Sequence, residues 1–449
     1  MNTFPPRLPW AEMYVRSGLK SLSDRMRQQS MVRRVRGAVA DVRTTVRDVA
    51  RNRIPEATSF VERVMKKVLA EPERGPSTLI NATGVIAPRG LALPLSDHAL
   101  AAMAGAGEGY ATAASASADT LLGELSGAPA ALVLHSPSIA VIAVLSTLGG
   151  DVVLACDHAV EIDGSPITRL AAAAGVQLAF VGSTGRVSRE DYRAALADEE
   201  SACVWHALQP SLAICGDVCA PARDEVFAIA RDAQAISVAF LEGASLEAGT
   251  ATENPWPADV SRAVTAGADL TIFSGERMLG GPSCGIVVGR SELVSLIAEH
   301  PLALASKLEP GRLAALAATL ELAKSAEGRA AIPLVQLLSA STENLKNRSE
   351  RLSVLLSGCE GVSAAEAVSC RGWATEGSLP TQQMDSWGVS ITPRDASAEE
   401  LLQKLVDGRP SLAATICDGR LLLNLRSVLA RQDGQISAVF GSKADLPLL

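Results

Sequence analysis

The feature that most constrains the fold of this chain is an alternation between short apolar runs and alanine-rich segments. The runs are Ala131–Leu134, Asp151–Ala155, Gln177–Val181, Cys203–Ala207, Ser237–Leu241, Leu270–Phe273 and Gly285–Val288. Short apolar runs bounded by turn residues are typical of buried strands, and the longer alanine-rich stretches are typical of helices. Their alternation predicts an α/β fold in which helices cover a mostly parallel sheet.

Beyond this region the pattern predicts a helical connection and a second, smaller α/β unit. The connection covers 312–355, and the smaller unit has strands at Trp387–Thr392 and Leu421–Leu425 and a helix at Ala398–Val406. A chain of 449 residues is long enough for two or three domains. We therefore predict a basic helical N-terminal module at 1–76, a large domain at 77–325 and a small C-terminal domain at 326–449.

The N-terminal module is basic, with 16 Lys and Arg residues against 8 Asp and Glu residues, although the whole chain has a formal net charge of −8. Between Ser21 and Leu69, apolar residues recur every three or four positions, which predicts one or two amphipathic helices broken near Pro55. A basic helical face attracts nucleic-acid phosphates. The alternative is a solvated helix face, because no aromatic residues are interleaved for stacking on bases.

Composition argues against several classes of protein and site. No apolar run reaches the roughly 18 residues that a membrane-spanning helix needs, and charged residues interrupt the N-terminus where a signal peptide would be apolar. We therefore expect a cytoplasmic protein without a membrane segment. Eight scattered cysteines indicate reduced thiols, and Cys215 and Cys219 have no histidine at ligand spacing, so no metal site is predicted.

The most specific motif lies in the segment Thr271–Pro282. Its matching positions are Ser274, Gly275, Leu279, Gly280, Gly281 and Pro282, followed by Gly285. They resemble a loop that reads roughly Ser-Gly-Asp-Lys-Leu-Leu-Gly-Gly-Pro in bacterial selenocysteine synthase, the L-seryl-tRNA(Sec) selenium transferase. Further segments are similar to that family between about Leu79 and about Leu429, among them Leu79–Val85, Val181–Arg186, Ala266–Leu270, His300–Leu302 and Asp418–Leu423.

This resemblance implies a fold-type I pyridoxal-phosphate enzyme fold, like that of aspartate aminotransferase, with the cofactor between the domains. It also implies a homo-oligomer, a dimer or larger, and tRNA binding through the N-terminal module. In the family a lysine of the loop holds pyridoxal phosphate as a Schiff base, and Arg277 stands at its position here. A desolvated lysine can lose its proton and attack an aldehyde, whereas a guanidinium stays protonated. Covalent attachment of the cofactor is therefore not possible at Arg277, and no cofactor is assigned.

Other parts of the implied cofactor pocket are altered as well. Ser136 and Ser138 precede a predicted helix at Ile139–Leu148 and suit either a phosphate site or an ordinary helix cap. Phe240 falls on the position of the family's aspartate, whose carboxylate keeps the pyridine nitrogen of the cofactor protonated. Glu242 lies two residues further on, and we expect a buried Phe240 and a surface Glu242. The resemblance assigns Ser136, Ser138, Ser274 and Arg277 to a degenerate cofactor pocket.

Residues that bind the substrate anion in the family are also changed. The family has two arginines after its His/Asn-Pro-Leu motif, and the matching positions here are Leu304 and Lys307. An ammonium binds oxyanions less specifically than a guanidinium fork, so Lys307 is a weak substrate-binding candidate. A further family arginine stretch is replaced by the short segment Ala111–Ser117.

These changes lead to two hypotheses. The first is a selenocysteine synthase-like pseudoenzyme that has lost pyridoxal-phosphate chemistry and keeps a binding or regulatory role. The alternative is an active transferase or lyase-type enzyme that uses noncovalent pyridoxal phosphate or another anionic ligand in the same cleft. In that case Arg277, Lys307 and Glu242 would line the cleft, with His135 or His158 as acid or base. No catalytic residue is assigned.

Overall fold

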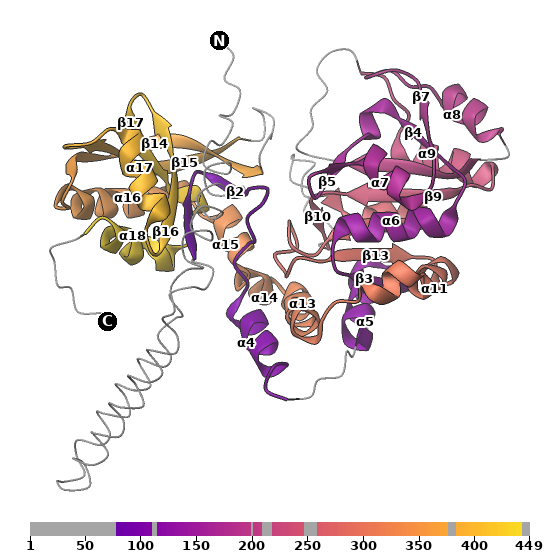
Figure 1. Ribbon diagram of the computed structural model, residues 1–449, viewed down its shortest axis with the longest axis horizontal. Helices are drawn as coiled ribbons and strands as arrows, with labels where there is room; N and C mark the ends of the chain where they lie inside the picture. Colours follow the sequence, from indigo (N-terminus) through magenta and orange to yellow (C-terminus); the bar gives the residue numbers. More distant parts are fainter. Residues whose placement is uncertain are drawn as a thin grey trace, which may run out of the picture.

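The computed structural model describes residues 78–109, 115–198, 201–208, 218–246, 258–375 and 383–441. Figure 1 shows two bodies, each built around a sheet, with helices between them. The N-terminal module predicted for 1–76, residues 111–114 of the segment that replaces the family arginine stretch, and Cys215 lie outside the described residues.

A seven-stranded sheet forms the larger body. Its strands are β3 (Ala130–Leu134), β4 (Asp151–Ala155), β7 (Leu178–Val181), β8 (Ser201–Leu208), β9 (Ile236–Leu241), β12 (Leu270–Ser274) and β13 (Gly285–Gly289). Their order is β3-β13-β12-β9-β8-β4-β7, and only β13 runs antiparallel to its neighbours. The mostly parallel sheet predicted from the seven apolar runs is therefore confirmed.

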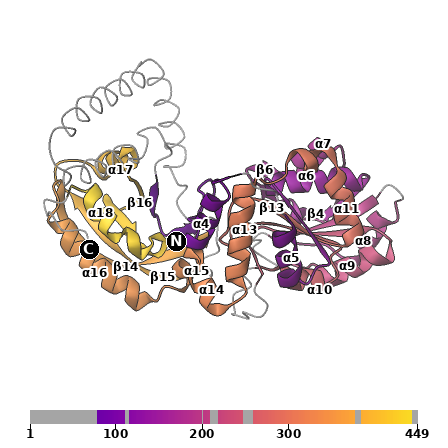
Figure 2. The same ribbon diagram turned by 90° about the horizontal axis from the view of Figure 1, so that it is seen from below.

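Helices cover both faces of this sheet because its strands are apolar on both sides. Val152 and Leu154 pack with α6 (Pro137–Leu148), α7 (Ile167–Ala174) and α11 (Ser291–Glu299), whereas Val153 and Ala155 pack with α8 (Arg189–Leu196) and α9 (Arg223–Asp232). The helices α5 (Ser115–Ser126) and α10 (Val260–Thr265) lie on the same side as α8 and α9 (Figure 2). This alternation of side chains across each strand produces three layers.

The smaller body contains a six-stranded sheet in the order β1-β16-β17-β15-β14-β2. Its strands are β1 (Leu79–Ala82), β2 (Val85–Ala87), β14 (Val362–Thr375), β15 (Gln383–Pro393), β16 (Ser411–Cys417) and β17 (Arg420–Asn424). Residues of α16 (Thr342–Ser357), α17 (Ala398–Asp407) and α18 (Asp433–Val439) complete its core. Residues 79–87, inside the range predicted for the large domain, therefore belong to the sheet of the small one.

The two bodies are joined by α13 (Pro310–Ala323), α14 (Ala326–Ala330) and α15 (Pro333–Ser339), and α4 (Asp97–Gly105) packs on α13. A proline at the first turn of α13 and of α15 starts a new helix there, because proline has no N–H to donate further back. Shorter elements are β5 (Glu161–Ile162), β6 (Ser165–Pro166), β10 (Ala244–Ser245), β11 (Ala258–Asp259) and α12 (Pro301–Ala305). Within the described ranges, no helix is long and apolar enough to cross a membrane.

Candidate functional site

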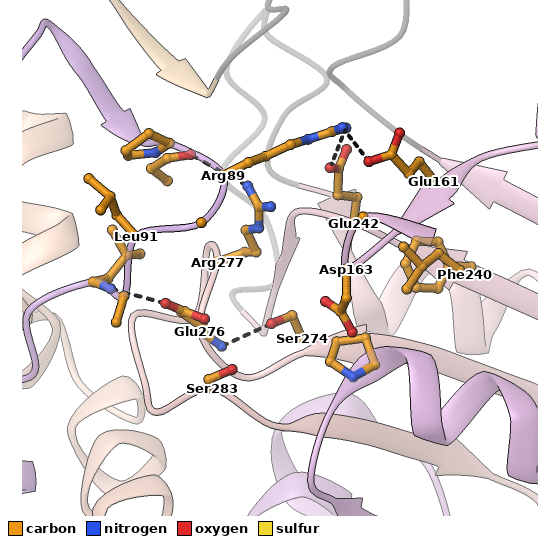
Figure 3. Close-up of a pocket in the computed structure, with 18 residues that line it drawn as sticks. Arg89, Leu91, Glu161, Asp163, Phe240, Glu242, Ser274, Glu276, Arg277 and Ser283 are labelled. Carbon is orange, nitrogen blue, oxygen red and sulfur yellow. Dashed lines mark hydrogen bonds and ion pairs between the residues drawn. The ribbon is translucent and has the colours of Figure 1, made fainter. Parts of the chain in front are cut away.

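A cavity of about 570 Å³ opens at the carboxyl ends of the parallel strands. It is lined by residues that follow β9 and β12, by the β5–β6 hairpin, by the first residue of α6 and by the segment 87–93, which leaves β2 (Figure 3). In open α/β sheets this edge is where ligands bind, because the strand ends and helix N-termini converge there. We call it the strand-end cavity.

The loop after β12 holds Arg277 at this cavity. The Gly275 N–H donates to Cys284 O at 3.0 Å, and the Gly281 N–H donates to Gly275 O at 2.9 Å, so the loop folds back on itself. A Cβ on Gly275 would lie 2.4 Å from Cys284 Sγ, which explains the glycine. The Arg277 guanidinium donates to Ala87 O at 3.4 Å, a long bond, and has no ion pair with a carboxylate of the described chain.

Arg89 links the segment 87–93 to two carboxylates of the large domain. Its guanidinium lies 3.2 Å from Glu242 Oε1 and 3.4 Å from Glu161 Oε1, as Figure 3 shows. A further tie is made by the Leu93 N–H, which donates to Glu276 Oε1 at 3.0 Å. These contacts hold the segment over the strand-end cavity by both its backbone and its side chains.

The expectation for Glu242 was wrong, whereas Phe240 is buried as expected. The side chain of Glu242 is only 12% exposed, because it lines the cavity beneath Arg89. Phe240 is 3% exposed and stacks on Trp205 with ring centroids 5.6 Å apart. Phe240, near the end of β9, and Glu242, just after it, both line the cavity.

The two serines at the start of α6 are both engaged in hydrogen bonds. Ser136 caps the helix by accepting the Ile139 N–H on Oγ at 3.3 Å. Ser138 donates its N–H to Asp163 Oδ2 at 2.9 Å and its hydroxyl to the same oxygen at 2.7 Å. Ser274, the last residue of β12, accepts the Glu276 N–H on Oγ at 3.2 Å.

Ser136 and Ser138 are not among the residues that line the strand-end cavity, and neither are the other candidates, His135, His158 and Lys307. His135 is exposed, and Lys307 is exposed where its backbone bridges to Leu134. His158 hydrogen-bonds Ala207 O through Nδ1 at 2.9 Å, and its ring lies 4.0 Å from that of His206. Burial lowers the pKa of His158 below its usual value. Of the residues proposed for one common cleft, only Arg277 and Glu242 meet there.

The residues around the cavity do not fit covalently bound pyridoxal phosphate. Among the described residues that line it there is no lysine to form a Schiff base, and the position implied for the pyridine carboxylate is occupied by Phe240. Glu242, the acidic residue that directly follows that strand, is paired with Arg89. The part of the chain that the structure describes also holds no group of His, Cys, Asp and Glu side chains suited to a metal ion.

Sequence reasoning missed the residues that shape the cavity most. These are Arg89, Glu161, Asp163 and Glu276, whose roles depend on partners far away in the chain. One local signal was available, because an Asp-Gly dipeptide such as Asp163-Gly164 favours a tight hairpin turn. It fixes the turn but not the contact with Ser138.

Comparison with known proteins agrees with the fold and with the motifs. The family model described as L-seryl-tRNA selenium transferase matches residues 106–429. An L-seryl-tRNA(Sec) selenium transferase of Moorella thermoacetica is 32% identical over 328 residues, covering 71% of this chain and 68% of the relative. One of Hyphomonas neptunium is 29% identical over 442 residues, covering 94% of each chain.

Solved structures give the same fold. The structure of D-glucosaminate-6-phosphate ammonia-lyase superposes with a TM-score of 0.59 at 17% identity, covering 84% of this chain and 96% of the other. At this identity the likeness shows the fold alone, that of a fold-type I pyridoxal-phosphate enzyme.

Proposed function

The chain belongs to the L-seryl-tRNA selenium transferase family, and we propose that it is a member without covalent pyridoxal-phosphate chemistry, which binds a small anion in the strand-end cavity. Its role is then one of binding or regulation. The observation that carries this proposal is Arg277, which stands at the position of the family lysine and projects into the cavity without a carboxylate partner in the described chain.

The difference in chemistry between lysine and arginine explains the loss of covalent cofactor attachment. Schiff-base formation needs a neutral amine with a free lone pair, and a guanidinium has none at any physiological pH because its lone pairs are delocalised. The same guanidinium presents a planar fork of N–H donors, which matches a carboxylate or another oxyanion. A change from lysine to arginine therefore removes the covalent step and keeps, or strengthens, anion binding.

The carboxylates around the cavity are bound to groups other than Arg277. Glu242 and Glu161 lie on Arg89, Glu276 accepts the Leu93 N–H, and Asp163 accepts from Ser138. None of these four carboxylates forms an ion pair with Arg277, whose guanidinium donates instead to the Ala87 carbonyl. A ligand anion would supply the charge-assisted partner that this arginine lacks among the described residues.

The loss of covalent chemistry is tested by borohydride reduction after incubation with pyridoxal phosphate, followed by peptide mass mapping. We expect no cofactor adduct in the cavity of the wild-type protein. The variant Arg277→Lys restores an amine at this position and serves as the positive comparison. A reduced adduct on a wild-type lysine, together with a Schiff-base absorbance that disappears when this lysine is replaced, would contradict the proposal. Bound cofactor without an adduct would support noncovalent binding instead.

Anion binding is tested by equilibrium dialysis with labelled acetate. We expect Arg277→Gln to weaken acetate binding at least about tenfold, the usual effect of losing one charge-assisted contact. Arg193→Gln is the matched control, because Arg193 is exposed on α8 and pairs with Glu190 three residues earlier. Equal acetate binding by the wild type and Arg277→Gln would remove Arg277 from the site.

We also propose that the N-terminal module binds tRNA and that the chain forms a homo-oligomer in the cytoplasm. The support is the basic excess of 1–76, which lies outside the described residues, and the family to which the chain belongs. Phosphate contacts by Lys and Arg make binding weaken steeply with salt. Filter binding at increasing salt should show tRNA retention by the full chain that is lost on deleting 1–76, and retention that survives the deletion would contradict the proposal.

A further inference from the structure

The N-terminus of α6 faces the strand-end cavity, and its backbone donors can be accounted for one by one. Pro137 opens the helix and has no N–H. The Ser138 N–H donates to Asp163, and the Ile139 N–H donates to Ser136 Oγ. The Ala140 N–H closes the first helical hydrogen bond, to Ser136 O. The donors that a helix usually offers to an anion at this end are therefore all in use.

Asp163 reaches this position because it sits at the tip of the β5–β6 hairpin. Asp163 and Gly164 have φ values of +49° and +79°, as the two central residues of a tight hairpin turn require. Among residues with a side chain, aspartate and asparagine adopt this left-handed backbone most readily. The turn aims the carboxylate at the helix, where one oxygen, Oδ2, accepts both the N–H and the hydroxyl of Ser138.

We propose that Asp163 is a specificity-determining residue that occupies the anion position at the N-terminus of α6, so that the strand-end cavity rejects phosphate-bearing ligands and accepts a ligand that presents a single carboxylate to Arg277. The part concerning Arg277 rests on the proposed function. The part concerning Asp163 rests on the hydrogen bonds of the helix and on the residues that share the cavity.

The charges around the cavity favour this ligand class. Four carboxylates line it, from Glu161, Asp163, Glu242 and Glu276, against two guanidinium groups, from Arg89 and Arg277. A phosphate monoester carries a charge of about −1.5 to −2 at neutral pH. It would have to displace Asp163 from Ser138 and then lie beside the displaced carboxylate, whereas a monoanion at Arg277 displaces no hydrogen-bonded carboxylate.

The position allows substitutions that separate occupancy from charge. Asp163→Gly removes the side chain and suits the positive φ, so it opens the Ser138 N–H without straining the turn. Asp163→Asn removes the charge but keeps an oxygen that accepts the same N–H, and asparagine also tolerates this backbone. Glu161→Gln removes one charge from the same hairpin and leaves the Asp163 contact in place.

The experiment measures binding of labelled inorganic phosphate to these full-length variants by equilibrium dialysis. We expect wild type, Asp163→Asn and Glu161→Gln to bind phosphate weakly and alike, and Asp163→Gly to bind it at least about tenfold more tightly. Circular dichroism melting checks that each variant is folded, and the hairpin geometry makes both Asp163 variants compatible with the native turn.

Each other outcome overturns the inference. If the wild-type protein binds phosphate as tightly as Asp163→Gly does, then the Asp163 carboxylate does not exclude phosphate. If Asp163→Asn or Glu161→Gln gains as much affinity for phosphate as Asp163→Gly does, then the net charge of the cavity decides against phosphate, and not the occupancy of the Ser138 N–H by Asp163. The acetate measurements on Arg277→Gln are independent of these, so a failure there removes the proposed function while the phosphate result still stands or falls separately.

Discussion

Gly285, the first residue of β13, is the position where one added methyl group tests how the α6 N-terminus is held. A Cβ at this residue would lie 2.3 Å from Ser136 O, 2.5 Å from Ser136 C and 2.8 Å from Pro137 N. All three atoms belong to the backbone that begins α6, and no side-chain rotation relieves the overlap. We therefore expect Gly285→Ala to destabilise the fold.

The size of the effect follows from these distances. Ordinary carbon contacts lie near 3.5 to 4.0 Å, so the helix start and the strand must separate by roughly 1 Å. Overpacking of a closely packed region costs about 1 to 3 kcal/mol. Because β13 is buried along its whole length between β3 and β12, little room is left for relaxation, and we expect a loss of about 2 to 3 kcal/mol.

Urea unfolding followed by circular dichroism measures this loss, with Gly434→Ala as the matched control. Gly434 lies in α18, and a Cβ there meets nothing within 4 Å, so alanine should leave stability unchanged or raise it by up to about 1 kcal/mol. The reasoning is refuted if the free energies of unfolding of Gly285→Ala and Gly434→Ala differ by less than about 0.5 kcal/mol.

Three further outcomes are expected. Glu242→Gln should lower the free energy of unfolding by about 1 to 2 kcal/mol, because the charge that pairs with Arg89 is lost from a side chain that is only 12% exposed. Glu161→Gln should change it by less than about 0.5 kcal/mol, because that carboxylate is 48% exposed. Similar shifts of the melting temperature for the two variants would contradict this. Burial raises the pKa of the Cys203 thiol to about 12, so iodoacetamide at pH 8 should label exposed Cys219 and leave Cys203 unmodified until the protein unfolds, and early labelling of Cys203 in peptide maps would count against its burial. Burial lowers the pKa of His206 well below 6.5, so below that pH the unfolded chain takes up a proton that the folded chain does not. The free energy of unfolding should therefore fall from pH 7 to pH 5, and His206→Gln should make this fall less steep. An unchanged pH dependence in His206→Gln would contradict the reasoning.

The larger sheet could be predicted from sequence because its strands are buried on both faces and read as continuous apolar runs. β14 and β16 could not, since β14 is rich in alanine and serine, and its polar positions face outward along one side of an antiparallel pair. β1 and β2 were not predicted as strands, because no local pattern in Leu79–Ala87 indicates that their partners lie far along the chain, in β16 and β14.

The same distinction applies to the strand-end cavity. Arg277 and Ser274 could be placed there because they belong to one short loop whose motif is continuous in the sequence. The pairing of Glu242 with Arg89 joins residues 153 positions apart, and that of Ser138 with Asp163 joins residues 25 apart. Contacts of this kind depend on the packed fold and leave no periodic trace in the chain.

The pairing of β1 with β16 has a consequence for how the protein is made. Leu79 pairs with Ser411, which leaves the ribosome more than 300 residues later. At about 5 to 20 residues per second, β1 waits roughly 15 to 70 s for its partner while the seven-stranded sheet can already be complete. Over that interval the hydrogen-bonding edge that later pairs with β16 is open to other chains, so β1 is sensitive to aggregation during synthesis until the C-terminal strands arrive to cover it.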